Sequence, residues 1–178
     1  MFYDKTIEGR YVDLRSAKVE DAEFARAIRR EPLFSKFFPP LDNTIEEQRQ
    51  WLRCQHDKPG DYFFVVWDKQ GNRIGTISLY DINGGTAESG RIAIKGNAFQ
   101  AMEAQLLNFK FAFDVLHLTT VVGYIFADNE RALRFNQQFG GAFYEPEMHD
   151  NGHMMVKVSF SKEQVETAEK KIGRMLYR

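Results

Sequence analysis

Three consecutive residues, Lys95, Gly96 and Asn97, stand where a predicted β-strand passes into a long predicted helix. A helix N-terminus presents unpaired N–H groups and a partial positive charge, so it can bind an anion such as a phosphate. The lysine adds a cation, the glycine a flexible backbone, and the asparagine a residue that tolerates left-handed geometry. The segment is therefore either a phosphate-binding turn or an ordinary short loop, and these residues alone leave both interpretations open.

A second polar group begins the following helix, where Asp128 and Asn129 come directly after a β-branched run. Asparagine at a strand-to-helix junction is most simply a helix N-cap. Gly140 and Gly141 are most simply the C-cap and turn that end this helix.

Other reactive side chains do not form recognisable sites. Cys54 is the one cysteine, and His56 faces another side of the predicted helix, so we expect an inert thiol. His149 and His153 are four residues apart, but residues 150–152 read Asp-Asn-Gly and predict a turn between them. Without a third ligand in view, we expect no metal site.

These residues must be positioned by strands and helices that alternate along the chain. A Thr44–Glu47 capping box predicts one helix start, and an apolar stripe of Phe99, Met102, Leu106, Phe109 and Phe113 predicts the longest helix. We expect strands at 11–14, 62–67, 73–80, 88–94, 119–126, 142–145 and 153–160, helices at 19–28, 44–56, 98–115, 128–140 and 161–175, and loops at 32–40 and 81–86. This order predicts an α+β fold, a three-layer arrangement of helices on both faces of a mixed, mostly antiparallel sheet of about seven strands with one parallel βαβ crossover.

The bulk properties restrict the class of protein. A length of 178 residues suits a single domain, 1–178, and a net charge of −1 argues against a general nucleic-acid binder. Nothing after Met1 resembles a signal peptide, and no apolar run approaches the roughly 20 residues that span a bilayer. We expect a cytoplasmic monomer or homodimer with no nucleic-acid or membrane partner.

The combined order and spacing of several segments resembles the GNAT N-acetyltransferase superfamily, in particular the branch of ribosomal-protein and amino-sugar N-acetyltransferases. The segments that carry the resemblance are Tyr11 to Arg15 with Glu20-Asp21, Arg73 to Ile77, Ala87-Glu88 with Gly90, Ala101 to Ala104, and Asn129 to Ala132 followed by Phe139-Gly140. The stretch from Arg73 to Phe143 resembles the core of the family.

The resemblance implies a cofactor, acetyl-CoA, in a cleft where the strands ending near Ile94 and Phe126 splay apart. The backbone of Ile92, Ala93 and Ile94 would bind the pantetheine arm, and Asn129 would contact the cofactor near the same end. The pyrophosphate would be held by the backbone of Gly96, Asn97, Ala98, Phe99, Gln100 and Ala101, with Lys95 beside it.

Two positions depart from the family pattern. Phe99 stands where a glycine is usual and limits close approach of the backbone, while Lys95 would compensate by direct charge pairing. Asn136, which is also a candidate cofactor-binding residue, stands where many members carry a tyrosine general acid. An amide cannot protonate a thiolate in that way, so the proton would come from water or from another group such as Tyr144.

The implied reaction is direct attack of an uncharged amine on the thioester, without a covalent enzyme intermediate. An alkyl ammonium must first lose a proton, so a base is needed near the splayed strands. Glu88 is the leading candidate for this base, although its side chain could equally be an ordinary exposed carboxylate at the start of a strand. Asp81 and His117 are weaker candidates. The candidate catalytic residues are therefore Glu88, Asn129 and Tyr144.

The sequence leaves three interpretations of the function open, two of which differ in the acceptor of the acetyl group. Residues 79–83, Leu-Tyr-Asp-Ile-Asn, are similar to a loop of amino-sugar nucleotide enzymes in this branch. A protein N-terminal acetyltransferase of the ribosomal-protein type is the rival, because Phe34, Phe37, Phe38 and Tyr80 could stack on a sugar ring or hold an apolar peptide end. A non-catalytic GNAT-like binding module is the third, motivated by the altered segment from Gly96 to Ala101.

Overall fold

The computed structural model describes residues 1–176, with side chains to residue 174. Its helices are α1 (Ala22–Arg30), α2 (Pro32–Ser35), α3 (Ile45–Asp57), α4 (Ala98–Lys110), α5 (Glu130–Gln137) and α6 (Lys162–Leu176), with a 3-10 turn η1 (Val19–Asp21) before α1 and a π-helical turn η2 (Phe111–Val115) after α4. Its strands are β1 (Ile7–Glu8), β2 (Val12–Ser16), β3 (Tyr62–Asp68), β4 (Arg73–Asn83), β5 (Thr86–Ile94), β6 (Thr120–Phe126), β7 (Ala142–Phe143), β8 (Glu147–Met148) and β9 (Met154–Ser161).

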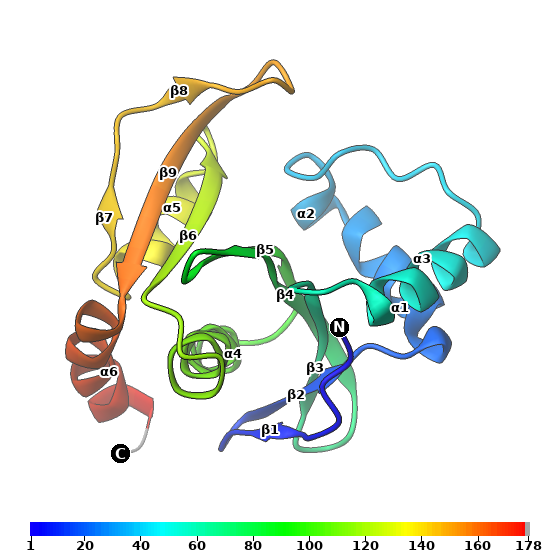
Figure 1. Ribbon diagram of the computed structural model, residues 1–178, viewed down its shortest axis with the longest axis horizontal. Coiled ribbons are helices and arrows are strands. Elements are labelled where there is room, and N and C mark those ends of the chain that lie inside the picture. The colour runs from blue at the N-terminus through cyan, green and yellow to red at the C-terminus, as the bar shows by residue number, and fades with distance from the viewer. Residues whose placement is uncertain (177–178) are drawn as a thin grey trace.

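The strands form one open sheet in the order β1-β2-β3-β4-β5-β6-β9-β7, with β8 also paired to β9 (Figure 1). Every pair is antiparallel except β5 with β6. The predicted mixed, mostly antiparallel sheet is therefore confirmed. In the described residues the sheet has nine strands where about seven were expected, and the two additional strands, β1 and β8, are each two residues long.

The parallel pair β5–β6 is short, and this shortness opens the sheet. Pairing covers only Thr86 to Glu88 on β5 and Thr120 to Val122 on β6. Beyond this point β5 stays paired to β4 as far as Ile94, and β6 stays paired to β9 as far as Phe126. The two halves of the sheet therefore separate after Glu88, and the expected splayed βαβ unit is confirmed.

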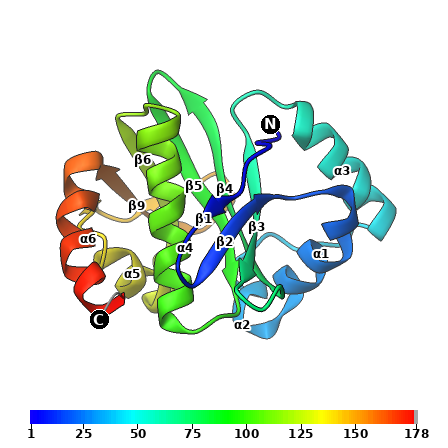
Figure 2. The ribbon, with the colours of Figure 1, turned by 90° about the horizontal axis from the view of Figure 1, so that it is seen from below.

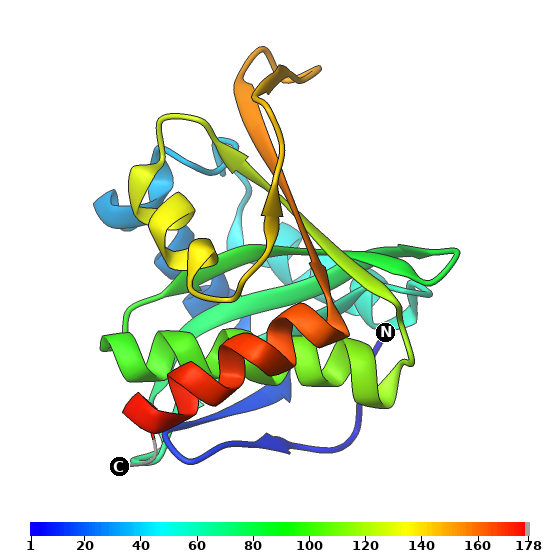
Figure 3. The same cartoon turned by 90° about the vertical axis from the view of Figure 1, so that its left-hand side faces the viewer.

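Helices cover both faces of the sheet, as predicted (Figure 2). On one face, α4 and α6 pack on the larger core cluster, whose largest buried side chains include Phe64, Phe109, Phe111, Phe139 and Phe160. On the other face, α1 and α3 enclose a smaller cluster built on Ala22, Leu52, Phe63 and Val65. Figure 3 shows α4 (green) and α6 (red) side by side, with β5, β6 and β9 above them.

Helix α4 is fixed to the sheet by buried polar side chains as well as by apolar packing. Glu103 accepts hydrogen bonds from the backbone N–H groups of Arg10, Tyr11 and Val12, at 2.9, 2.6 and 2.9 Å. On β5, the Ser89 hydroxyl accepts from the side chains of Gln105 (3.2 Å) and Asn108 (3.0 Å). Because buried polar groups are costly when unpaired, these bonds fix both the position and the rotation of α4.

Three local expectations are wrong. Residues 81–86 are not a loop, because β4 runs to Asn83 and β5 begins at Thr86, joined by Gly84 and Gly85, both with positive φ as a two-residue hairpin turn requires. The expected loop 32–40 contains α2. The stripe on α4 is buried at its other four positions, but Phe99 is 43% exposed and stacks on Tyr11 instead of joining the core.

Candidate active site

Glu88 lies at the point where the sheet separates. It is the last β5 residue paired with β6, where it stands opposite Val122, and on β4 it stands opposite Tyr80. Successive residues of a strand point to opposite faces, and the next residue, Ser89, bonds to α4. Glu88 therefore points to the face that α1 and α3 cover.

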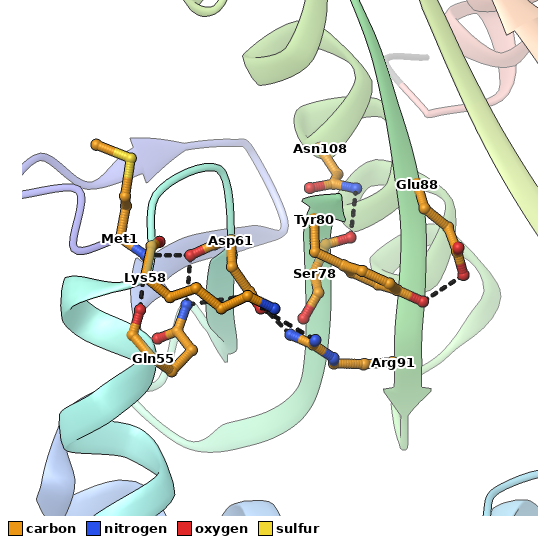
Figure 4. A network of polar contacts seen from close by, with 9 residues as sticks. All are labelled: Met1, Gln55, Lys58, Asp61, Ser78, Tyr80, Glu88, Arg91 and Asn108. Carbon is orange, nitrogen blue, oxygen red and sulfur yellow. Dashed lines mark hydrogen bonds and ion pairs between the residues drawn. The ribbon is translucent and has the colours of Figure 1, made fainter. Parts of the chain in front are cut away.

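The Glu88 carboxyl is half-buried and has one defined partner, because Oε1 accepts a short hydrogen bond from the Tyr80 hydroxyl (Figure 4). Burial raises the pKa of Glu88 above its ordinary value, and the charge of Asp81 adds to the rise. The Tyr80 hydrogen bond opposes this rise, as does the positive charge of Arg91. Burial and the neighbouring carboxylate likewise raise the pKa of Tyr80, so its hydroxyl keeps its proton and acts as a donor.

Arg91 holds Tyr80 from the other side. Its backbone is left-handed (φ 52°) at a bulge where β5 has one residue more than β4, and this turns the side chain toward α3. The guanidinium carbon lies 4.1 Å from the centre of the Tyr80 ring. The two terminal nitrogens bind the carboxylate of Asp61 at 2.7 and 3.1 Å. Although burial opposes the charged form of Asp61, its bonds to Arg91 keep the pKa of Asp61 below its ordinary value.

Gly90 makes this arrangement possible. A Cβ atom on Gly90 would overlap the Tyr80 hydroxyl, so the tyrosine can lie along β5 and reach Glu88 only because this position has no side chain. Glu88 and Tyr80 are candidates from the sequence, whereas Arg91 and Asp61 were not predicted. A bulge in the middle of a strand leaves no signal in a single sequence that would have identified them.

The segment before α4 caps its own helix. Asn97 Oδ1 accepts from the N–H of Gln100 at 3.0 Å, and Gln100 Oε1 accepts from the N–H of Asn97 at 2.9 Å. Asn97 has a φ of −74°, so it is an N-cap and does not use the left-handed geometry that it tolerates. The Gln100 side chain lies against Gly96, where an added Cβ would come within 2.8 Å of Gln100 Oε1. Within residues 1–176, no hydrogen bond is assigned to the N–H groups of Ala98 and Phe99.

The remaining residues predicted to bind the cofactor lie around the same gap. Ile92 is half-buried, Ala93 and Ile94 are buried, and Ala93 and Ile94 pair with β4 on the edge away from β6. Lys95 extends from the end of β5 and forms an exposed ion pair with Glu31 at 2.9 Å. Asn129 caps α5, accepting from the N–H of Ala132 at 3.1 Å.

Three further candidates are not in contact with Glu88. Asn136 is on α5 and donates to the carbonyl of Ala132 at 2.9 Å. Tyr144 is 52% exposed, and its hydroxyl lies 3.3 Å from that of Ser159, which stands opposite Val122 and so one strand beyond the gap. His117 follows η2 at the far end of the α4 segment.

The other reactive side chains are used structurally or remain on the surface. Cys54 is exposed, and His56 Nε2 lies 2.5 Å from the carbonyl oxygen of Ala17. His149 and His153 pack on the rings of Tyr124 and Phe126, with ring centres 4.9 Å apart in each pair. No group of three or more His, Cys, Asp or Glu side chains able to hold a metal ion occurs in the described part of the chain.

A sheet that opens between two parallel strands, with a helix N-terminus at the gap, is the arrangement expected of an N-acyltransferase of the GNAT type. The chain belongs to the acetyltransferase (GNAT) domain family, which matches residues 12–142. It is an acetyltransferase that acts on an amine.

Individual proteins support this membership. The chain is 31% identical to acetyltransferase PseH of Campylobacter jejuni subsp. jejuni serotype O:2 (strain ATCC 700819 / NCTC 11168) over 137 aligned residues. The aligned region covers 75% of this chain and 84% of PseH. The fold matches apo FdhC, a nucleotide-linked sugar GNAT, with a TM-score of 0.81 and 19% identity over 98% of this chain and 99% of FdhC. It also matches the spermidine N-acetyltransferase of Vibrio cholerae in complex with CoA and spermine, with a TM-score of 0.79 and 18% identity over 88% and 98% of the two chains.

Within residues 1–176, no helix combines the length and the apolar composition that crossing a membrane would take.

Proposed function

We propose that this chain, acting as one domain over residues 1–178, transfers the acetyl group of acetyl-CoA to the primary amine of a nucleotide-linked amino sugar. The observation that carries the proposal is the place of Glu88, a half-buried carboxylate of raised pKa at the apex of the gap between β5 and β6. A carboxylate of raised pKa is a better proton acceptor at neutral pH, as a general base requires. We further propose that the enzyme works in the cytoplasm as a monomer or homodimer.

In this proposal Glu88 takes a proton from the acceptor ammonium. The freed amine nitrogen attacks the thioester carbonyl carbon, a C–N bond forms, and the C–S bond breaks to release CoA as a thiolate. The thiolate then takes up a proton from water or from the Tyr144 hydroxyl. Tyr80 and Arg91 are positioning residues, because they hold the Glu88 carboxylate in place and are not assigned contacts with the reacting atoms.

The gap has features suited to CoA. The edge of β5 beyond Glu88 is not paired to β6, so the backbone of Ile92, Ala93 and Ile94 is available to a pantetheine arm. At the start of α4, the amides of Ala98 and Phe99 and the helix dipole face the same end of the gap, and they suit a pyrophosphate. The amides of Asn97 and Gln100 are already occupied by side chains, which a phosphate would have to displace. Asn129 and Asn136 remain candidates for contacts on the α5 side.

Two observations favour a nucleotide-linked amino sugar over a peptide N-terminus. Residues 79–83, which resemble a loop of amino-sugar nucleotide enzymes, form the end of β4 and place Tyr80 against Glu88. The fold also matches FdhC, which is itself described as a nucleotide-linked sugar GNAT. Aromatic rings, among them Phe37 packed on Phe126 with centres 5.8 Å apart, lie on the elements beside the gap and offer surfaces on which a sugar ring can stack.

The test is a thiol-release assay with acetyl-CoA and four kinds of acceptor: nucleotide-linked amino sugars, the same amino sugars without the nucleotide, peptides with free N-termini, and spermidine. We expect the highest kcat/KM with a nucleotide-linked amino sugar, and no release when its amine is already acetylated. Preference for a peptide would support the ribosomal-protein-type alternative. The absence of a thermal shift with millimolar acetyl-CoA would contradict the proposed use of this cofactor.

A further inference from the structure

A pocket of about 350 Å³ lies between α1 and α3 on the face of the sheet to which Glu88 points. Helix α1 contributes Ala25 and Arg29, and α3 contributes Glu47, Gln48 and Trp51. The remaining lining residues are Leu41, Asn43, Phe63 and Arg91.

Hydrogen bonds hold the walls of this pocket in place. Arg26 Nε donates to the carbonyl oxygen of Asn43 at 2.7 Å, and Asn43 Nδ2 donates to Gln48 Oε1 at 2.8 Å. The segment before α3 is thereby tied to both helices. The pocket does not depend on a ligand for its shape.

Two residues of the described lining, Arg29 and Asn43, have a buried polar atom without a hydrogen-bond partner, and of these Arg29 carries a charge. Its Nε is buried without a hydrogen-bond partner, and among the described residues no carboxylate lies within 4.0 Å of its guanidinium. Its assigned contact is with the ring of Phe38, 4.9 Å from the guanidinium carbon. Burial, with the nearby charge of Arg91, lowers the pKa of Arg29. A half-buried cation without a counter-ion favours an anionic ligand.

Of the other charged side chains in the described lining, Arg91 has a counter-ion and Glu47 is held by hydrogen bonds. Arg91 is neutralised by Asp61 through two hydrogen bonds. Glu47, the carboxylate of the lining, accepts from the backbone N–H and the hydroxyl of Thr44 at the start of α3. Arg29 is therefore the cation that remains to bind a ligand.

Arg91 connects this pocket to the proposed catalytic group. Its guanidinium forms part of the pocket wall and lies against the ring of Tyr80, whose hydroxyl donates to Glu88. Only two side chains therefore separate the pocket from Glu88. A ligand in the pocket could extend past Arg91 toward the gap between β5 and β6.

We propose that this pocket binds the phosphate-bearing end of the nucleotide-linked acceptor, with Arg29 pairing with a phosphate and Trp51 offering an apolar wall to a ring. The inference rests on the proposed function and specifies how its acceptor is recognised. Trp51 is 37% exposed and is held edge-on by Phe63, with ring centres 5.3 Å apart. The Arg91 guanidinium carbon lies over the ring at 5.4 Å from its centre, so the position of the ring is preformed and a ligand ring would stack on the part that Arg91 leaves exposed. An unpaired arginine would repel a polyamine such as spermidine and gain nothing from an uncharged peptide end.

The first experiment measures the binding of UDP, dTDP, GDP and inorganic pyrophosphate by calorimetry in the presence of saturating CoA, which prevents these anions from occupying the CoA site. We expect at least one nucleoside diphosphate to bind. Arg29→Gln should raise the Kd for that nucleoside diphosphate at least tenfold. Arg29→Lys, which keeps the charge, should raise this Kd less. Arg30→Gln, an exposed neighbour on α1 that does not line the pocket, is the matched control and should change the Kd less than twofold.

The second experiment is kinetic and separates this inference from the proposed function. Arg29→Gln should raise the KM for a nucleotide-linked amino sugar and leave the KM for acetyl-CoA unchanged. The amino sugar that lacks a nucleotide has no phosphate to pair with Arg29, so its KM should rise by a smaller factor than that of the nucleotide-linked sugar.

The inference is overturned if no nucleoside diphosphate binds the CoA-loaded enzyme, or if Arg29→Gln binds it as the wild type does. In either case a wild-type enzyme that still releases thiol from acetyl-CoA with an amino sugar would leave the proposed function standing. Failure of the wild type to bind acetyl-CoA would instead contradict the proposed function itself.

Discussion

Glu88 depends on its neighbours for the chemistry assigned to it. Its carboxylate is half-buried, receives a hydrogen bond from Tyr80, and lies near the charges of Arg91 and Asp81. Burial disfavours the charged form, whereas the hydrogen bond and the arginine favour it. The balance leaves a carboxyl group of raised pKa that still has a fixed orientation, as proton transfer from a bound ammonium requires.

Replacing the carboxylate by an amide removes the proposed base and nearly conserves its shape. We expect Glu88→Gln to lower kcat/KM by a factor on the order of 10² to 10⁴, the usual contribution of general acid–base catalysis. Steady-state kinetics across a range of pH would measure this, together with thermal unfolding to verify the fold. Glu145→Gln, at an exposed carboxylate beyond β7, is the control. Full activity of Glu88→Gln at every pH would remove Glu88 from the mechanism.

Removing the Tyr80 hydroxyl tests how the pKa of Glu88 is set. The hydrogen bond from Tyr80 stabilises the carboxylate and so lowers the pKa of Glu88, and its loss in Tyr80→Phe should raise that pKa. Since the base works only when deprotonated, the acidic limb of the pH profile of kcat/KM should move to higher pH. Tyr3→Phe, whose ring packs on Phe111 in the core, is a hydroxyl-deletion control. A limb that stays in place or moves to lower pH would contradict the assigned role of Tyr80.

At the scale of elements, β5 and the start of α4 together form the proposed cofactor site. The bulge at Arg91 redirects one side chain toward α3, while the strand continues along β4 to Ile94. At the start of α4, side chains already cap the amides of Asn97 and Gln100, whereas no described side chain caps those of Ala98 and Phe99. Cofactor binding and helix capping therefore compete for the same backbone groups.

This competition predicts opposite effects of one substitution on stability and on binding. Gln100→Ala removes the bond to the Asn97 N–H, so we expect a free energy of unfolding lower by about 1 kcal/mol. Because a phosphate would then find that amide unoccupied, CoA should bind more tightly. Urea denaturation and calorimetry measure the two effects, with Gln138→Ala, near the end of α5, as the control. Weaker binding of CoA by Gln100→Ala would instead indicate that this side chain contacts the cofactor.

Local signals in the sequence predict elements well and contacts between them poorly. The capping box at Thr44 and Glu47, the Asn129 cap and the apolar stripe from Met102 to Phe113 depend on neighbours three or four residues away, and all are confirmed. The hairpin at Gly84-Gly85 was missed because Asp81 and Asn83 are poor strand residues, whereas the pairing of β4 with β5 outweighs that propensity. Arg91 meets Asp61 across 30 residues of chain, through a bulge that depends on strand register.

At the scale of the whole molecule, the two faces of the sheet differ in what they carry. The face of α4 and α6 holds the larger apolar core, and the N-terminus of α4 meets the gap between β5 and β6. The face of α1 and α3 carries Glu88, Tyr80, Arg91 and the pocket beside Arg29. If the proposed function holds, acetyl-CoA and its acceptor would approach the gap from different sides and meet at Glu88.

The most direct test of this account is backbone hydrogen exchange measured with and without acetyl-CoA. Bound cofactor should slow exchange in residues 89–101 and at the start of α5, because these backbone groups border the gap, and should leave the turn around His117 unchanged. Protection confined to those segments is the result that we predict. Protection elsewhere with none in residues 89–101 would contradict the claim that the gap between β5 and β6 is the acetyl-CoA site.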